Sequence, residues 1–335
     1  CQRRMTGAVQ TSQLLLIAAG GTISMVRDAQ TGQSVPTLTA EELLARTAID
    51  AQTVRCLDLP YPGAVISSGA DLLSLAQGIT SAAKDPVRGV VVTHGTDTLE
   101  EVAYGIDEML SGVFPIVFTG AMRPSWAPEF DGIQNLEQAL RVAAGAPAES
   151  GALVTMQAEI FEAWSVYKAD TQALDAFTAR RGAVRGRVAE KQIEFPRPAF
   201  PRSRFSRIPP VLPSSVPILT MGVGDDAALP RKLAASDVVN GLVVASMGAG
   251  SLPPVASEHL FRLARTGVPV VCCSSVPSGP TEILDYYPGA YAELRDAGIL
   301  IEDYLSPRKA RIRLMISLGL GVSYVPFGQT VSEQA

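Results

Sequence analysis

Residues 89–111, GVVVTHGTDTLEEVAYGIDEMLS, pass from a run of valines through a polar stretch into a helical pattern, and this segment decides the fold. The valines favour a buried strand that ends at Thr93, and apolar residues spaced at i, i+3, i+4 and i+7 predict a helix from Thr98 to Ser111. The same alternation recurs along the first half of the chain. Further strands are predicted over Leu14–Ala18, Ile116–Thr119 and Leu153–Met156, and further helices over Ala70–Lys84 and Ile133–Ala144. Repeated strand and helix units of this kind build a doubly wound, mostly parallel α/β sheet.

A proline-rich segment separates two parts of the chain. Seven of the 24 prolines fall within residues 195–217, and proline interrupts both helices and strand ladders. Beyond it, strands are predicted over Ile218–Met221, Gly241–Ala245 and Val268–Cys272, and helices over Ala227–Ala234, Ser257–Thr266 and Pro307–Leu318. We therefore predict an N-terminal α/β domain over residues 1–194, a linker over 195–217 and a smaller C-terminal α/β domain over 218–335. A chain of 335 residues is long enough for two such domains.

Composition excludes several classes of protein. The longest clean apolar run, Leu14–Ala19, is far shorter than the ~20 residues that cross a bilayer, so no membrane partner is expected. The net charge is −5 and the basic residues are scattered, which argues against nucleic acid as a partner. Four cysteines without Cys-x-x-Cys spacing and only two histidines supply neither a disulfide framework nor a structural zinc site.

The first residues bear on localisation. The chain opens Cys1-Gln-Arg-Arg, and Met5 offers a natural start just before the first predicted strand. Nothing there has the long apolar stretch of a signal peptide, so we expect a cytoplasmic protein. An exported or lipid-anchored protein is the alternative, if Cys1 is a native processed end.

Polar clusters follow several predicted strands, at the edge where open α/β sheets bind ligands. They are AGGTI (residues 19–23), THGTDTLEE (93–101), GAMRP (120–124), YKADT (167–171) and GAGSL (248–252). Each cluster alone has a structural explanation: a glycine turn, a helix cap, a structural hydrogen bond of His94, or a solvated Lys168 in a polar turn. The glycines complete neither a phosphate loop nor a dinucleotide fingerprint. Lys168 is informative because the chain has 23 arginines but only five lysines, and only lysine loses its proton readily when buried.

Taken together, these clusters resemble the bacterial-type L-asparaginase/glutaminase family. The resemblance covers essentially the whole chain, and it includes two further strings, VPSG (residues 276–279) and PRKAR (307–311). It implies an amidohydrolase that converts the small-molecule amide L-asparagine to L-aspartate and ammonia through an acyl-enzyme, with possible glutaminase activity and with neither a metal nor a cofactor.

The resemblance assigns roles to five residues. Thr22 matches the nucleophilic threonine on a loop that closes over the substrate. Thr96 matches a second threonine, whose backbone N–H helps to form the oxyanion hole, with Lys168 beside it. Asp97 matches the residue that binds the substrate's α-amino group, and the carbonyl of Ala121 matches the acceptor that orients the leaving amide nitrogen.

These assignments make chemical sense, because a threonine hydroxyl is a weak nucleophile that needs a nearby base. A desolvated lysine held near a carboxylate can move protons to and from such a hydroxyl. General base help and one oxyanion donor each accelerate a reaction by ~10² to 10⁴, so the chemistry needs no metal.

Two further substrate-binding assignments follow from the resemblance. One is Gly21, beside the nucleophile. The other is a loop in which family members have a serine that binds the substrate's carboxylate and this chain has another residue. The best match for that serine is Gly63, in Tyr61-Pro62-Gly63-Ala64, with Ala64 next to it. Loss of the serine removes a carboxylate contact and opens space, so a same-fold amidase acting on a larger or modified amide is the alternative function. A non-catalytic binding or regulatory homologue is a further alternative, which the retained threonines and Lys168 argue against.

The C-terminal part contributes Ser251 and an acidic residue. Ser251 falls where family members reach a neighbouring subunit's site, which implies a homodimer or homotetramer. Glu282 and Asp285 are both candidates for the acidic residue that follows the Val-Pro-x-Gly segment.

Overall fold

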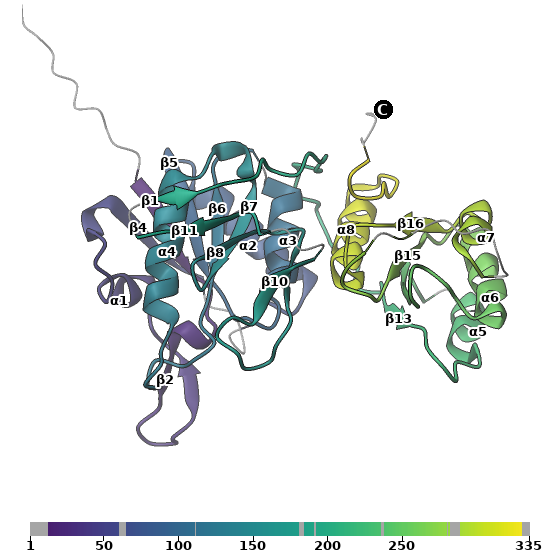
Figure 1. Cartoon of the computed structure of the whole chain (residues 1–335), viewed down its shortest axis with the longest axis horizontal. Coiled ribbons are helices and arrows are strands. Elements are labelled where there is room, and N and C mark those ends of the chain that lie inside the picture. Colours follow the sequence, from purple (N-terminus) through teal and green to yellow (C-terminus); the bar gives the residue numbers. More distant parts are fainter. Residues whose placement is uncertain are drawn as a thin grey trace, which may run out of the picture.

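The computed structural model describes residues 13–59, 65–110, 112–180, 184–190, 192–235, 238–279, 281 and 289–329. Within these ranges the chain forms two sheet-containing lobes that helix α8 (Pro307–Leu320) joins (Figure 1). The prediction of a doubly wound, mostly parallel sheet followed by a smaller C-terminal α/β unit is confirmed.

The larger lobe is built on an eight-stranded sheet in the order β12-β11-β8-β7-β6-β5-β1-β4. Its strands are β1 (Gln13–Ala18), β4 (Val54–Asp58), β5 (Val87–Thr93), β6 (Ile116–Thr119), β7 (Ala152–Met156), β8 (Glu159–Glu162), β11 (Gly186–Val188) and β12 (Ile193–Glu194). Strands β4, β1, β5, β6 and β7 are parallel. The first-lobe helices are α1 (Ala40–Leu44), α2 (Gly69–Ala82), α3 (Leu99–Leu110) and α4 (Gly132–Gly145).

The alternation of side chains along β1 shows why helices cover both faces of this sheet. Leu15 and Ile17 belong to the core cluster that contains the apolar faces of α2 and α3. Leu14 and Leu16 belong to a second cluster with α1 and α4. Successive strand residues point to opposite faces, so a strand that is apolar at every position is buried on both sides.

Strand pairing continues beyond the elements that the sequence predicts. Strands β8, β11 and β12 extend the sheet past β7 in antiparallel pairs. Two small antiparallel hairpins accompany it, one of β2 (Met25–Arg27) and β3 (Ser34–Pro36), the other of β9 (Val166–Lys168) and β10 (Phe177–Ala179). These strands of two to four residues are too short to produce a clear periodic pattern in the sequence.

The smaller lobe is a four-stranded parallel sheet in the order β13-β14-β15-β16. Its elements are β13 (Ile218–Thr220), α5 (Ala228–Ala234), β14 (Leu242–Ser246), α6 (Pro254–Arg265), β15 (Val270–Ser274), α7 (Tyr291–Asp296), β16 (Leu300–Glu302) and α8. Helix α6 begins three residues before the predicted Ser257, because Pro254 is accepted in the first turn of a helix.

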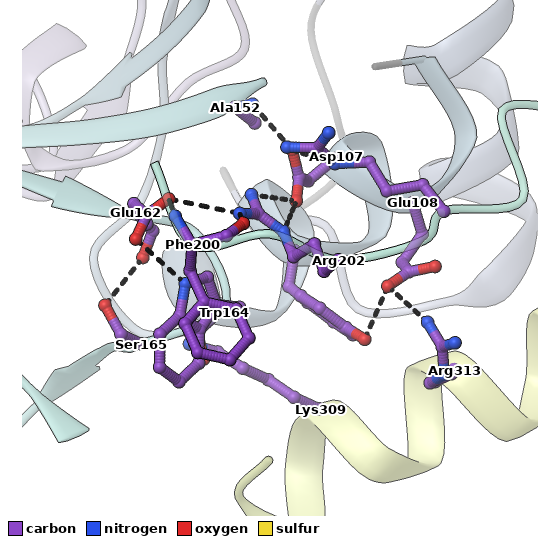
Figure 2. Close-up of polar contacts among 12 residues, drawn as sticks. Asp107, Glu108, Ala152, Glu162, Trp164, Ser165, Phe200, Arg202, Lys309 and Arg313 are labelled. Atoms are coloured by element: carbon purple, nitrogen blue, oxygen red, sulfur yellow. Dashed lines mark hydrogen bonds and ion pairs between the residues drawn. The ribbon is translucent and has the colours of Figure 1, made fainter. Parts of the chain in front are cut away.

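A buried ionic network joins the two lobes (Figure 2). Arg202 bridges Asp107 of α3 and Glu162 of β8, at 2.8 and 3.1 Å, and Arg313 of α8 meets Glu108 of α3 at 2.7 Å. Arg202 lies in the proline-rich segment 195–217, which contains no helix or strand and adds the buried Leu212 and Val216 to the core. We propose that this segment, predicted as a linker between the domains 1–194 and 218–335, also adds a few side chains to the core.

No helix among the described residues is long and apolar enough to cross a membrane.

Candidate active site

The loops that follow three neighbouring parallel strands meet at one edge of the large sheet. The Ala19 N–H donates to Thr93 O at 3.0 Å, which joins the loop after β1 to the end of β5. The His94 N–H donates to Thr119 O at 2.9 Å, which joins the loop after β5 to the end of β6. The clusters that the sequence places at residues 19–23, 93–101 and 120–124 are therefore adjacent.

Glycine allows the first two of these loops to touch through their backbones. Gly21 has φ 87°, a left-handed conformation that glycine adopts without strain. A Cβ atom at Gly21 would lie 2.6 Å from the Gly95 Cα, which no real side chain tolerates. The chain around Thr22 is thereby pressed against the backbone that leads into Thr96.

Thr22 opens a short 3-10 turn, Thr22–Ser24, and its side chain is partly exposed. The buried Ser24 closes the turn, because both its N–H and its hydroxyl donate to Gly21 O, at 3.0 and 2.9 Å. Within the described residues, no hydrogen bond occupies the Thr22 hydroxyl. The β2–β3 hairpin follows directly and is held by Ser125, whose hydroxyl donates to Met25 O at 2.7 Å.

The polar centre of the site is a cluster of Thr96, Asp97 and Lys168. The Lys168 Nζ lies 2.9 Å from Thr96 Oγ1 and 2.9 Å from Asp97 Oδ1. Thr96 is 7% exposed, whereas the Asp97 side chain is 77% exposed, so the cluster runs from the protein interior to solvent. A lysine held between a hydroxyl and a carboxylate can give a proton to a reacting group beside Thr96 as the ammonium, and take one back as the neutral amine.

Lys168 is the last residue of strand β9. The prediction that it lies in a polar turn is wrong. Its side chain is 19% exposed and its backbone N–H donates to Glu100 Oε2 at 3.0 Å. Lys168 pairs with Phe177 of β10 in the antiparallel β9–β10 hairpin. The interpretation of Lys168 as a solvated surface charge is therefore wrong.

His94 serves the architecture of the site, as its sequence context suggested. Its Nδ1 lies 2.7 Å from Gly95 O, and the ring is fully buried. Burial lowers the pKa of His94 to about 4, so the ring is neutral at pH 7.

The third loop is made rigid by the start of α4. Asp131 accepts hydrogen bonds from the N–H groups of Met122 and Arg123, at 3.0 to 3.1 Å. Asn135 donates to Gly120 O at 3.1 Å and to Asp131 at 2.9 Å. Ala121, between these anchored groups, is fully buried.

Comparison with known proteins shows the family of this chain. The family model for the asparaginase N-terminal domain matches residues 13–200, and the model for the glutaminase/asparaginase C-terminal domain matches residues 215–325. The chain belongs to the asparaginase family. A probable L-asparaginase of Deinococcus radiodurans is 34% identical over 321 residues, which cover 93% of this chain and 94% of the relative. L-asparaginase 2 of Escherichia coli is 33% identical over 258 residues, covering 73% of this chain and 70% of the relative.

Solved structures of asparaginases have the same fold. The crystal structure of a probable cytoplasmic L-asparaginase from Campylobacter jejuni matches with a TM-score of 0.77 and 26% identity, over 92% of this chain and 95% of that one. The thermostable L-asparaginase from Thermococcus kodakarensis matches with a TM-score of 0.81 over 92% and 93%, and at 23% identity it supports the fold alone.

The other predicted site residues of this asparaginase-family chain lie apart from the cluster or outside the described residues. Ser251 lies in the smaller lobe, in a turn after β14 that hydrogen bonds between Met247 and Ser251 close at both ends. The predictions for Gly63, Ala64, Glu282 and Asp285 concern residues outside the described ranges.

Sequence reasoning missed three supporting carboxylate and amide side chains. An acidic residue such as Glu100 is expected in the first turn of a helix, near the positive end of the helix dipole. The sequence therefore gives no sign that Glu100 also accepts the backbone N–H of Lys168 and holds that residue in place. Asp131 and Asn135 stand one helical turn apart at the start of α4, a spacing typical of paired side chains. Their partners lie 8 to 15 residues away in an irregular loop, so spacing alone did not reveal them.

Proposed function

We propose that this protein hydrolyses the side-chain carboxamide of L-asparagine, giving L-aspartate and ammonia, with Thr22 as the nucleophile. Glutamine is the expected side substrate. Family membership over both domains supports the reaction class. The observation that carries the residue assignment is the Lys168 ammonium at 2.9 Å from both Thr96 and Asp97, beside the loop that bears Thr22.

In the first half-reaction, the Thr22 Oγ attacks the carboxamide carbon, and the hydroxyl proton of Thr22 passes to the amide nitrogen. The C–N bond of the tetrahedral intermediate then breaks, and the protonated nitrogen leaves as ammonia. An ester between Thr22 and the substrate remains. In this proposal the Thr96 N–H helps to stabilise the oxyanion, an effect worth ~10²-fold or more per donor, and Asp97 binds the α-ammonium of the substrate.

In the second half-reaction, a water molecule attacks the ester carbon. The Thr96 hydroxyl accepts a proton from this water and passes its own proton to Lys168, as Lys168 gives one of its ammonium protons to the departing Thr22 oxygen, which leaves as a hydroxyl. Aspartate is released and the starting protonation state returns. The exposed Asp97 carboxylate keeps the Lys168 amine in place throughout.

Replacement of Thr22 by alanine tests the assignment. The hydroxyl makes no hydrogen bond to a described residue, so Thr22→Ala should change the free energy of unfolding by no more than about 1 kcal/mol. The kcat for ammonia release from asparagine should fall by about 10³ or more. Thr53→Ala, at an exposed threonine beside β4, is the matched control. A Thr22→Ala enzyme that retains a tenth of the wild-type rate would exclude Thr22 as the nucleophile.

A larger or modified amide is the second candidate substrate, and the glycine at position 63 favours it. If this residue replaces a carboxylate-binding serine, Gly63→Ser should add one hydrogen bond to a charged group, worth about 1.5 to 3 kcal/mol. The KM for asparagine should fall, while activity on a larger amide should fall too. Equal changes in kcat/KM across a panel of asparagine, glutamine, N-substituted and ring-closed amides would contradict both expectations.

We also propose a homodimer or homotetramer in which Ser251 completes a neighbouring subunit's site. Sedimentation of the purified protein should give a mass of at least two chains. A monomer that is fully active would exclude this role for Ser251.

We place the protein in the cytoplasm. Cys56, Cys272 and Cys273 are free thiols, and adjacent unpaired cysteines suit a reducing compartment. Fractionation of the native host should recover the activity with cytoplasmic markers, whereas activity in the membrane or periplasmic fraction would point to export.

A further inference from the structure

Helix α8 of the smaller lobe reaches the backbone of the strand that carries Lys168. Lys309, in the first turn of α8, is 1% exposed. Its Nζ donates to Trp164 O at 3.1 Å and to Val166 O. Figure 2 shows the side chain leaving α8 and running beneath Trp164. Val166 is the first residue of β9 and Lys168 is the last.

This lysine is costly to bury, so packing alone does not explain it. Both of its bonded acceptors are neutral carbonyls, and burial lowers the pKa of Lys309 to about 8. The charges that face it are mixed: Glu100, Glu101 and Asp107 of α3 raise this pKa, while Arg180, just after β10, lowers it. A methionine of similar length would fill the space without the cost of desolvating an ammonium.

The same turn of α8 also holds the beginning of α3. Arg308 lies 3.8 Å from both Glu100 and Glu101, and Arg311 meets Glu101 at 3.0 Å. Glu100 in turn accepts the backbone N–H of Lys168. Helix α3 starts two residues after Asp97, so α8 touches both segments that supply the Thr96, Asp97 and Lys168 cluster.

We propose that Lys309 is a positioning residue for amide hydrolysis: its bonds to Trp164 O and Val166 O fix β9 and so hold the Lys168 ammonium against Thr96 and Asp97. The inference rests on the proposed function. Hydrogen bonds weaken rapidly beyond about 3.2 Å, so a shift of β9 by a fraction of an ångström breaks one of the two contacts that Lys168 makes at 2.9 Å. The smaller lobe thereby controls a catalytic contact in the larger lobe of the same chain.

Kinetics of Lys309→Met give the first test. We expect kcat for asparagine to fall about 10- to 100-fold, the cost of a small misplacement of a catalytic group, with KM changed less than about threefold. The amide of Lys309→Gln can donate to a carbonyl without carrying a charge, so the kcat of this variant should lie between those of Lys309→Met and the wild type. Lys232→Met, at an exposed lysine of α5, is the matched control and should leave both constants unchanged. Unchanged kcat in Lys309→Met, or equal losses in kcat and in substrate affinity, would overturn the positioning role.

Chemical rescue separates a lost ammonium from lost packing. Lys309 lines a cavity of about 550 Å³ that also borders Lys168, so a small amine can reach the space that Lys309→Ala creates. Propylammonium should restore kcat of Lys309→Ala at least about fivefold in a saturable manner, and propan-1-ol, which has no charge, should not. Equal restoration by both compounds would assign Lys309 to packing and overturn the proposal.

A readout independent of turnover distinguishes failure of this inference from failure of the proposed function. The chain has five lysines, so ¹⁵Nζ-lysine labelling gives a sparse NMR spectrum in which Lys168→Met and Lys309→Met assign two signals. Loss of the Lys309 side chain should shift the Lys168 signal and speed its hydrogen exchange. An unmoved Lys168 signal would overturn the positioning role even in an active enzyme. A shifted signal in a protein that releases no ammonia from asparagine would support the positioning and refute the proposed substrate.

Discussion

The contact between Lys168 and Thr96 makes a quantitative prediction about how the two residues act. If Lys168 serves the reaction through Thr96, the variants Lys168→Met and Thr96→Val must fail together. Methionine keeps the length and apolar stem of lysine, and valine keeps the shape of threonine, so each change removes polar contacts with little loss of packing.

The expected size follows from the geometry. Lys168→Met removes two hydrogen bonds of 2.9 Å in which the ammonium is charged, and each is worth about 1.5 to 3 kcal/mol. If both are needed in the transition state, the loss of about 3 to 6 kcal/mol corresponds to about 10² to 10⁴ in kcat. Thr96→Val removes one of the two bonds and should cost about 10 to 10².

A double-mutant cycle measures the coupling. We expect the double variant to lose about as much as Lys168→Met alone, because residues of one catalytic unit are non-additive. The assay is steady-state ammonia release from asparagine, with thermal unfolding to confirm that all four proteins fold. A double variant whose loss equals the product of the single losses would show that Lys168 does not act through Thr96.

Three further predictions concern the architecture around the site. Gly21→Ala should lower kcat by at least about 10²-fold, because a Cβ there collides with Gly95 and displaces the loop that bears Thr22 by a few tenths of an ångström or more. Wild-type kinetics in this variant would refute the close approach of Gly21 to Gly95. Because the folded-state pKa of His94 lies near 4, below its usual 6.5, the unfolded chain binds the extra proton and stability falls as pH drops from 6.5 toward 4. Between pH 7 and pH 5, the free energy of unfolding measured in urea should therefore fall by about 2 kcal/mol less in His94→Gln than in the wild type. His259→Gln, at the chain's other histidine, is the control. Equal falls in all three proteins would contradict the buried neutral ring. Asp107→Asn should reduce the free energy of unfolding by about 3 to 5 kcal/mol, since it leaves the buried Arg202 and the half-buried Arg204 without their shared carboxylate, and a change below about 1 kcal/mol would show that this network is not coupled to folding (Figure 2).

The sequence alone was sufficient for the parallel core of the protein and for its family. Runs such as Val90–Val92 are apolar at every position and long enough to predict a strand buried on both faces, and the helices between them carry a full helical period. Polar residues at the ends of those strands converge wherever the strands are parallel, so Thr22 and Thr96 could be placed at one sheet edge without coordinates.

Only the tertiary structure decided how Lys168 is held and what surrounds it. Lys168 is separated from Thr96 by 72 positions, and it reaches the cluster on a three-residue strand that has no sequence period of its own. Its supports come from farther still, since Lys309 meets Val166 across 143 positions. Local patterns report the local backbone, whereas contacts of this kind depend on how the two lobes pack, so a buried lysine and an exposed one look the same in the sequence.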